Sequence, residues 1–198
     1  MTRIVGIAGS LRRGSYNSAL LRAAATLMPP GAELVVATIA GIPLYDGDVE
    51  ANEGIPPAVA ELKDVIAAAD GLLLATPEYN NSVPGVFKNA IDWLSRPPAD
   101  AARVFAGRRV ALVGASPGGF GTVLSQNAWL PILRTLGCEL WSGRLLVSRA
   151  ASVFDAQGAL ADAKLAESLR GYLAGYVAWV DAALTRGATA TTAGGPAR

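Results

Sequence analysis

The stretch RIVGIAGSLRRGSYNSALLRAAATL, Arg3–Leu27, decides the fold because it joins a short apolar run to a helix-forming segment through a single polar loop. The run Arg3–Gly9 predicts a buried strand. The alanine- and leucine-rich segment Ser15–Leu27 predicts a helix that ends before the turn residues at 29–31. A continuously apolar strand followed by a helix is typical of a parallel sheet that helices cover on both faces.

The rest of the chain repeats this alternation of strands and helices. Further strands are predicted at Ala32–Ala40, Gly71–Pro77, Arg108–Ser116 and Cys138–Ser148, the last allowing a break at Gly143. Further helices are predicted at Pro57–Asp70, Val86–Ser95, Thr122–Leu136 and Leu160–Leu184. We therefore expect one α/β domain over residues 1–186, a flavodoxin-like, doubly wound three-layer sandwich with a five-stranded parallel sheet in the order 2-1-3-4-5. The small, polar segment 187–198 is expected to be a disordered tail.

The composition narrows the chemistry that this chain can perform. Its 198 residues include no histidine, which removes the commonest general base, and a single cysteine, Cys138, which permits no intrachain disulfide. A net charge of +1 gives no sign of a nucleic-acid or membrane partner, and no apolar run is long enough to span a bilayer. We expect a cytoplasmic protein without a metal site, whose chemistry, if it is an enzyme, comes from an added cofactor.

Three unusual loops follow strands that the predicted sheet places side by side. They are GSLRRGSYN (Gly9–Asn17), PEYNNSVPG (Pro77–Gly85) and SPGGFG (Ser116–Gly121). Ligands of such sheets bind beyond the carboxyl ends of the strands, where the winding direction reverses, and in the order 2-1-3-4-5 that point lies between the first and third strands. The coincidence of the three loops there predicts a ligand site.

The first loop begins like a nucleotide-binding phosphate loop but does not end like one. Gly9 and Gly14 have the required spacing, whereas Ser15 and Tyr16 stand where lysine and a metal-binding Ser or Thr should follow. A diphosphate with Mg²⁺ would need those missing residues.

The donors that remain in the first loop suit a terminal phosphate monoester. The backbone N–H groups at the start of the helix are unpaired and lie at its positive end. Short side chains at Ser10, Ser15 and Asn17, together with Arg12 or Arg13, could add hydrogen bonds. In the alternative interpretation, Ser15 or Asn17 only caps the helix and the arginines are solvated.

The second and third loops suit a flat, polar ring. Pro77 and Pro84 stiffen the ends of the second loop, and Asn80 and Asn81 tolerate turn conformations. Tyr79 and the neighbouring Glu78 would face the ring, Glu78 through its backbone rather than its charge, and the third loop would approach closely at Gly118 and Gly119. The alternatives are an ordinary hairpin-like turn for the second loop and a tight strand-to-helix turn for the third.

Together, the motifs GSLRRGSYNSALLRAA, PEYNNSVPGVFKNAIDWLSRP and SPGGFGT resemble the NADPH-dependent FMN reductases, the flavodoxin-like group that includes chromate, quinone and azo reductases. The resemblance implies non-covalently bound FMN, with NADPH or NADH as co-substrate and no catalytic residue from the protein. It implies that the phosphate is held by Ser10, Arg12, Ser15 and Asn17 with Tyr16 alongside, and the ring by Pro77, Glu78, Tyr79, Asn80, Ser82, Ser116, Gly118 and Gly119.

The resemblance further implies hydride transfer from the nicotinamide to FMN and then, in a ping-pong cycle, reduction of a small-molecule acceptor such as a quinone, chromate, an azo compound or free flavin. It implies a homodimer or homotetramer, for which the helix carrying Phe87 and Trp93 could be an interface or simply part of the core. An FMN electron carrier without its own nicotinamide activity is the main alternative, although such carriers tend to be strongly acidic. A non-catalytic module that binds another phosphorylated ligand is the second alternative.

Overall fold

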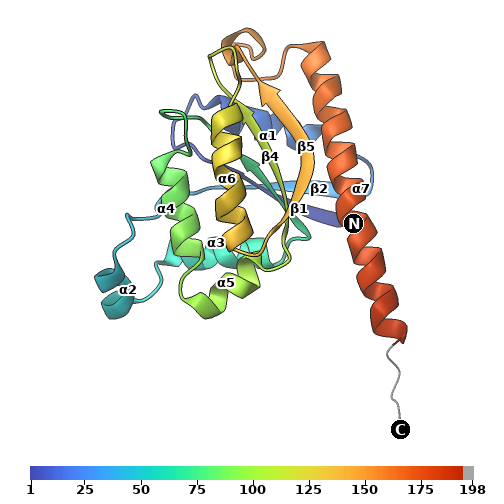
Figure 1. Ribbon diagram of the computed structural model, residues 1–198. Helices are drawn as coiled ribbons and strands as arrows, with labels where there is room; N and C mark the ends of the chain where they lie inside the picture. Colours follow the sequence, from blue (N-terminus) through green and yellow to red (C-terminus); the bar gives the residue numbers. More distant parts are fainter. Residues whose placement is uncertain (194–198) are drawn as a thin grey trace.

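Five parallel strands form the middle layer of the computed structural model, which describes residues 1–193 and the side chains of residues 1–186. They are β1 (Thr2–Ala8), β2 (Ala32–Ala37), β3 (Gly71–Ala75), β4 (Arg109–Ala115) and β5 (Glu139–Val147). Their order is β2-β1-β3-β4-β5 and every pairing is parallel, which confirms the predicted flavodoxin-like topology (Figure 1).

Helices cover both faces of this sheet. On one face lie α1 (Tyr16–Thr26) and α7 (Ala163–Ala193); on the other lie α3 (Pro57–Ala67), α4 (Gly85–Leu94), α5 (Pro98–Phe105) and α6 (Val123–Thr135). The strands alternate their apolar side chains between the two layers, as strand geometry requires. Ile4 of β1, for example, packs beneath α1 and α7, whereas Val5 packs against the opposite helices.

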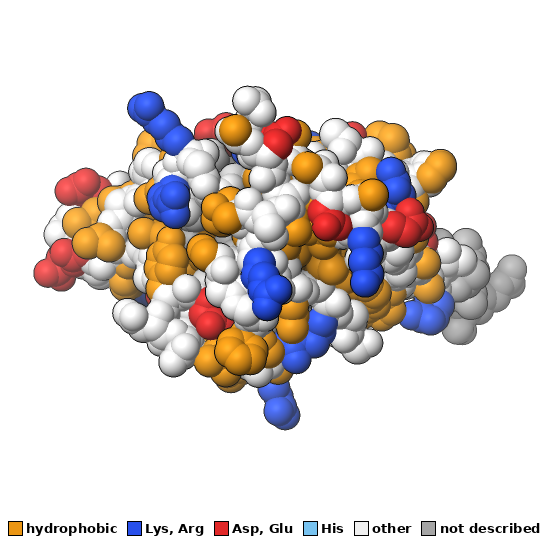
Figure 2. Space-filling view, turned by 90° about the horizontal axis from the view of Figure 1, so that it is seen from above, with side chains coloured by type: hydrophobic (Ala, Val, Ile, Leu, Met, Phe, Trp, Pro, Cys, Tyr) orange, Lys and Arg blue, Asp and Glu red, His pale blue; other side chains and the backbone are white. Residues whose placement is uncertain are grey.

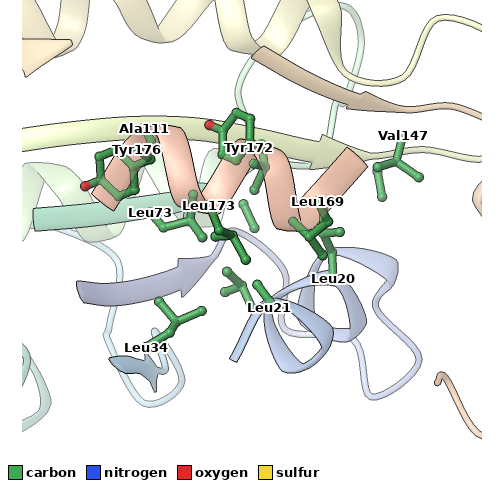
Figure 3. Close-up of a cluster of buried hydrophobic side chains, with 14 of the residues drawn as sticks. Leu20, Leu21, Leu34, Leu73, Ala111, Val147, Leu169, Tyr172, Leu173 and Tyr176 are labelled. Carbon is green, nitrogen blue, oxygen red and sulfur yellow. The ribbon is translucent and has the colours of Figure 1, made fainter. Parts of the chain in front are cut away.

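The layer under α1 and α7 is built from leucines and buried tyrosines. Leu20 and Leu21 of α1 meet Leu169 and Leu173 of α7 over the sheet (Figure 3). Tyr176 is fully buried and donates hydrogen bonds from its hydroxyl to the carbonyls of Leu72 and Arg109, at 2.8 and 2.9 Å. This burial raises the pKa of the Tyr176 phenol well above its ordinary value.

Two short α-helices were not predicted from the sequence. The segment α2 (Gly47–Glu53) lies within a predicted loop, and α5 lies between a predicted helix and strand. α2 buries no residue and begins where the Asp46 side chain accepts from the Asp48 N–H, so it has no apolar periodicity for the sequence to reveal.

The last helix and the last strand also differ from the prediction. α7 continues to Ala193 because no proline and only one glycine follow Leu184 within it; the tail predicted from residue 187 therefore lies partly in this helix and partly, from 194, outside the described residues. β5 is continuous but irregular at the predicted break, since its pairing shifts from Val110↔Leu140 to Leu112↔Arg144. Within residues 1–193, no helix has the combination of length and hydropathy needed to cross a membrane.

Candidate functional site

The three unusual loops meet at the carboxyl end of the sheet, the end that Figure 2 views from above. They enclose a depression of about 70 Å³. Its lining is Ser10, Arg12, Ser15, Tyr16, Asn17, Pro77, Glu78, Tyr79, Ala115, Ser116 and Pro117. Four of the predicted site residues, Asn80, Ser82, Gly118 and Gly119, do not line it.

The first loop folds tightly onto the start of α1. Ser15 is the helix N-cap, accepting from the Ser18 N–H at 3.2 Å, and its own N–H donates to the carbonyl of Arg12. The N–H groups of Tyr16 and Asn17 occupy the first turn of the helix, where no intrahelical acceptor exists, so they remain available to a ligand. Ser15 therefore caps the helix, and this cap leaves the N–H groups of Tyr16 and Asn17 without an intrahelical acceptor.

Position 9 has room only for glycine. A Cβ at this position would collide with the ring of Phe87 in α4, which is itself fully buried. The backbone of the first loop therefore lies directly on α4, the helix that follows the second loop, and this close approach brings the two loops together.

The Asn17 side chain has a different role from the predicted one. Its amide nitrogen donates to the carbonyl of Ala115 and its oxygen accepts from the Ala115 N–H, both at 2.9 Å, and the side chain is buried. The amide therefore joins α1 to the end of β4, and Asn17 can serve a ligand through its backbone N–H.

The second loop turns at two asparagines in left-handed conformations. Asn80 and Asn81 have φ values of 50° and 62°, and Tyr79 and Ser82 exchange two backbone hydrogen bonds across them. Positive φ at both central residues is the conformation of a tight hairpin turn, which asparagine tolerates. The hairpin-like interpretation is therefore correct for the tip of this loop, whereas Pro77, Glu78 and Tyr79 line the depression.

The Glu78 carboxylate caps a helix, a role that the sequence did not reveal. Its Oε2 accepts from the N–H groups of Leu124 and Ser125, at 2.8 and 3.0 Å, at the start of α6. The N-cap residue of α6, Thr122, makes no side-chain capping bond, so Glu78 supplies it from another loop. This arrangement compensates the negative charge with the helix N-terminus.

A buried polar network lies behind the second loop. The Thr76 hydroxyl donates to the Pro77 carbonyl at 2.9 Å, lies 2.8 Å from the Ser125 hydroxyl, and accepts from the indole N–H of Trp129 at 2.9 Å. All three side chains are buried. The network fixes Pro77 at the edge of the depression, and only the positions of these residues in the fold, not their spacing in the sequence, could have identified it.

The third loop is the most open of the three. Gly118 and Gly119 are exposed, and Phe120 beside them has 82% of its surface exposed. The Ser116 hydroxyl donates to the Gly121 carbonyl. The third loop therefore leaves its side of the depression open to solvent.

The chemistry of the site is that of binding rather than of acid–base catalysis. Arg12 and Glu78 are the charged residues of the lining, and the Glu78 carboxylate already accepts hydrogen bonds from the start of α6. In residues 1–193, no group of three His, Cys, Asp or Glu side chains could hold a metal ion. An exposed arginine beside a helix N-terminus suits a phosphate monoester, and Pro77, Tyr79 and Pro117 offer apolar surface to a flat ring.

Comparisons with known proteins agree with this chemistry. Residues 2–152 match the model of the family described as NADPH-dependent FMN reductase. The chain is 48% identical to the NAD(P)H-dependent FMN reductase of Pseudomonas aeruginosa, over 90% of this chain and 95% of that protein. It is 36% identical to the 2-hydroxy-1,4-benzoquinone reductase of a Burkholderia species, over 90% and 96%. The structure of the flavoenzyme NAD(P)H:(acceptor) oxidoreductase from Paracoccus denitrificans is similar with a TM-score of 0.80 and 33% identity, covering 91% of this chain and 98% of that one.

Proposed function

The chain belongs to the NADPH-dependent FMN reductase family, and from this membership we propose that it oxidises NAD(P)H through FMN bound at the three loops and reduces a quinone. The family is described as NADPH-dependent FMN reductase, the Pseudomonas aeruginosa relative as an NAD(P)H-dependent FMN reductase and the Burkholderia relative as a benzoquinone reductase, which favours an enzyme over an electron carrier. The observation that carries the assignment of the site is its lining: a helix N-terminus with one uncommitted cation, beside apolar surface and without an acid–base cluster.

The first loop holds the phosphate in this proposal. Arg12 contributes a charge-assisted hydrogen bond, and the hydroxyl groups of Ser10 and Ser15 together with the N–H groups of Tyr16 and Asn17 contribute neutral ones. One terminal phosphate requires neither the lysine nor the metal of a nucleotide phosphate loop, which explains why both are missing from the motif.

The second and third loops hold the ring. The N–H and carbonyl of Tyr79 are both bonded to Ser82, so in this proposal Glu78 rather than Tyr79 offers its backbone to the ring. The Tyr79 side chain and Pro117 cover the ring, and the exposed Gly118 and Gly119, although outside the lining of the depression, leave room for it beside Pro117 because they carry no side chains. FMN held by these loops would supply the redox chemistry, namely hydride acceptance from NAD(P)H and two-electron reduction of an acceptor.

The rim of the site suits a flat, poorly soluble acceptor. Leu11 and Tyr79 are 57% and 47% exposed, and Phe120 is 82% exposed on the third loop. Apolar side chains exposed around a depression favour an aromatic ligand over a small oxyanion. With a quinone, the overall reaction is NAD(P)H plus H⁺ plus quinone giving NAD(P)⁺ plus hydroquinone, which balances two electrons and two protons.

The assembly proposed is a homodimer or homotetramer in the cytoplasm, supported by the family resemblance. Phe87 and Trp93 are fully buried within one chain, so they belong to the core and an interface would use other residues. Sedimentation of the FMN-loaded protein measures the assembly directly.

Anaerobic titration tests the acceptor. The FMN-loaded protein would be reduced with one equivalent of NADPH and then mixed with 1,4-benzoquinone in one arm and with chromate in another. We expect fast reoxidation of the reduced protein by the quinone, with one hydroquinone formed per NADPH. In steady-state assays, double-reciprocal plots of rate against NADPH concentration at several quinone concentrations should give parallel lines. A protein that NADPH reduces but that quinones do not reoxidise would contradict the proposed acceptor.

A further inference from the structure

A second concave surface lies on the other side of the first loop. It is a groove of about 490 Å³ between the start of α1 and the segment 151–158, which follows β5. Ser15 and Tyr16 line both this groove and the candidate cofactor site, so the two are contiguous. The proposed binding of FMN uses the first loop from one side only.

Two arginines without partners line this groove. Arg13 and Arg22 are exposed, and in the part of the chain that the structure describes neither guanidinium takes part in a hydrogen bond or ion pair. Arg22 lies against the turn at Gly158, where an added Cβ would be 3.1 Å from its Nη2. Gly158 has a φ of 77°, so it is fixed as glycine by its conformation as well as by this approach.

Asp155 is the one acidic residue of the lining, and its carboxylate already accepts hydrogen bonds from the backbone of its own turn. Asp155 accepts from the N–H groups of Gln157 and Ala159 through Oδ1, at 2.9 and 2.8 Å. Two unpaired guanidinium groups therefore face one hydrogen-bonded carboxylate, and the groove carries a net positive charge.

The groove also has an aromatic floor. The rings of Tyr16 and Phe154 are stacked, with centroids 6.0 Å apart and planes inclined by 19°. Phe154 is 7% exposed, whereas Tyr16 is half-buried and contributes to the lining of both sites. Flat apolar surface beside cationic side chains suits a heteroaromatic base that carries a phosphate.

We propose that this groove binds the adenosine end of NADPH and that Arg13 and Arg22 bind its 2′-phosphate, so that the enzyme prefers NADPH to NADH. The inference rests on the proposed function. NADPH and NADH differ only in this phosphate monoester, and paired guanidinium groups are the side chains best matched to a phosphate dianion. Continuity with the cofactor site lets one nucleotide contact both surfaces.

Steady-state kinetics of charge-removing variants test the proposal. In the FMN-loaded enzyme, Arg22→Gln and Arg13→Gln should each raise KM for NADPH by about ten- to a hundredfold, with kcat and KM for NADH unchanged. Arg134→Gln is the matched control, because Arg134 is an exposed arginine in the last turn of α6, away from the groove. Equal effects on NADPH and NADH, or none, would overturn the assignment.

A binding measurement separates this inference from the proposed function. Equilibrium dialysis of adenosine 2′-monophosphate against the FMN-loaded protein should show binding that adenosine 5′-monophosphate does not match and that Arg22→Gln weakens at least tenfold. No preference between the two nucleotides would overturn the proposal even if NADPH reduces the protein. If neither NADPH nor NADH reduces the protein, the proposed function fails, and the dialysis still decides what the groove binds. A weaker FMN affinity in Arg13→Gln and Arg22→Gln, with no change in selectivity, would instead assign the groove to the FMN phosphate.

Discussion

Replacing Asn17 with alanine tests the hydrogen bonds that connect the first loop to the sheet. The Asn17 amide exchanges two hydrogen bonds with the backbone of Ala115, both at 2.9 Å, and Ala115 is 3% exposed. The substitution removes both bonds and leaves the N–H and carbonyl of Ala115 buried without partners.

The expected cost follows from that geometry. Leaving a buried polar group unsatisfied costs about 1–3 kcal/mol, and two such groups here give about 2–4 kcal/mol, because water can enter the vacated space and recover part of the loss. Asn17→Asp is an isosteric companion. Its carboxylate can still accept from the Ala115 N–H but is repelled by the carbonyl, so it should also destabilise the protein at pH 7.

Urea unfolding of the FMN-free protein measures these costs without interference from the cofactor. Asn17→Ala should lower the free energy of unfolding by about 2–4 kcal/mol. Its effect on FMN affinity should be smaller than that of Arg12→Gln, because the Asn17 backbone N–H remains in place. Unchanged stability together with a large loss of FMN affinity would refute the reasoning, since it would mean that the amide contacts the cofactor rather than Ala115.

Four further predictions concern the site and the core. Arg12→Gln should raise the Kd for FMN about ten- to a hundredfold, measured by fluorescence titration; an unchanged Kd would remove Arg12 from the phosphate site. Glu78→Gln should lower the free energy of unfolding by about 0.5–1 kcal/mol, because the amide keeps an acceptor for α6 but loses the charge, and an equal loss in Glu78→Ala would contradict a capping role. The ammonium of Lys63, whose side chain is 1% exposed, holds the pKa of Asp100 below its ordinary value, so the contribution of the pair is present above about pH 4 and disappears as the pH falls through the lowered pKa. Asp100→Asn should therefore lower the free energy of unfolding by about 1–2 kcal/mol at pH 7 and by little near pH 2. The loss at pH 7 is smaller than for a fully buried pair because Asp100 is 34% exposed. A loss that did not depend on pH would show that it does not come from this ion pair. Burial raises the pKa of the Cys138 thiol to about 12, so iodoacetamide at pH 8 should modify the folded protein far more slowly than the unfolded one, and equal rates would show that the thiol is accessible.

The sheet could be predicted because its signal is local. Each strand is a continuous apolar run, and the three unusual loops follow strands that the topology places side by side. The apolar runs predict the parallel sheet, and the flavodoxin-like strand order, taken from the known doubly wound folds, then predicts that the three loops meet. The short helix α2 could not be predicted, because it buries no residue and so leaves no periodic pattern.

The roles of individual side chains within the site were harder to predict. Asn17 and Glu78 belong to the motifs that identify the site, yet their side chains bond to Ala115 and to the start of α6. Both partners lie far along the chain, so no spacing in the sequence points to them. The capping role of Ser15 was predictable, because it depends only on the helix that begins at the next residue.

The measurement that tests the central claim most directly is an anaerobic visible spectrum of the protein after incubation with FMN and desalting, taken before and after addition of NADPH. We predict that the flavin absorbance is retained and then bleaches promptly. Retained colour that NADPH does not bleach would contradict the assignment as a reductase, and loss of the colour on desalting would contradict the FMN site itself.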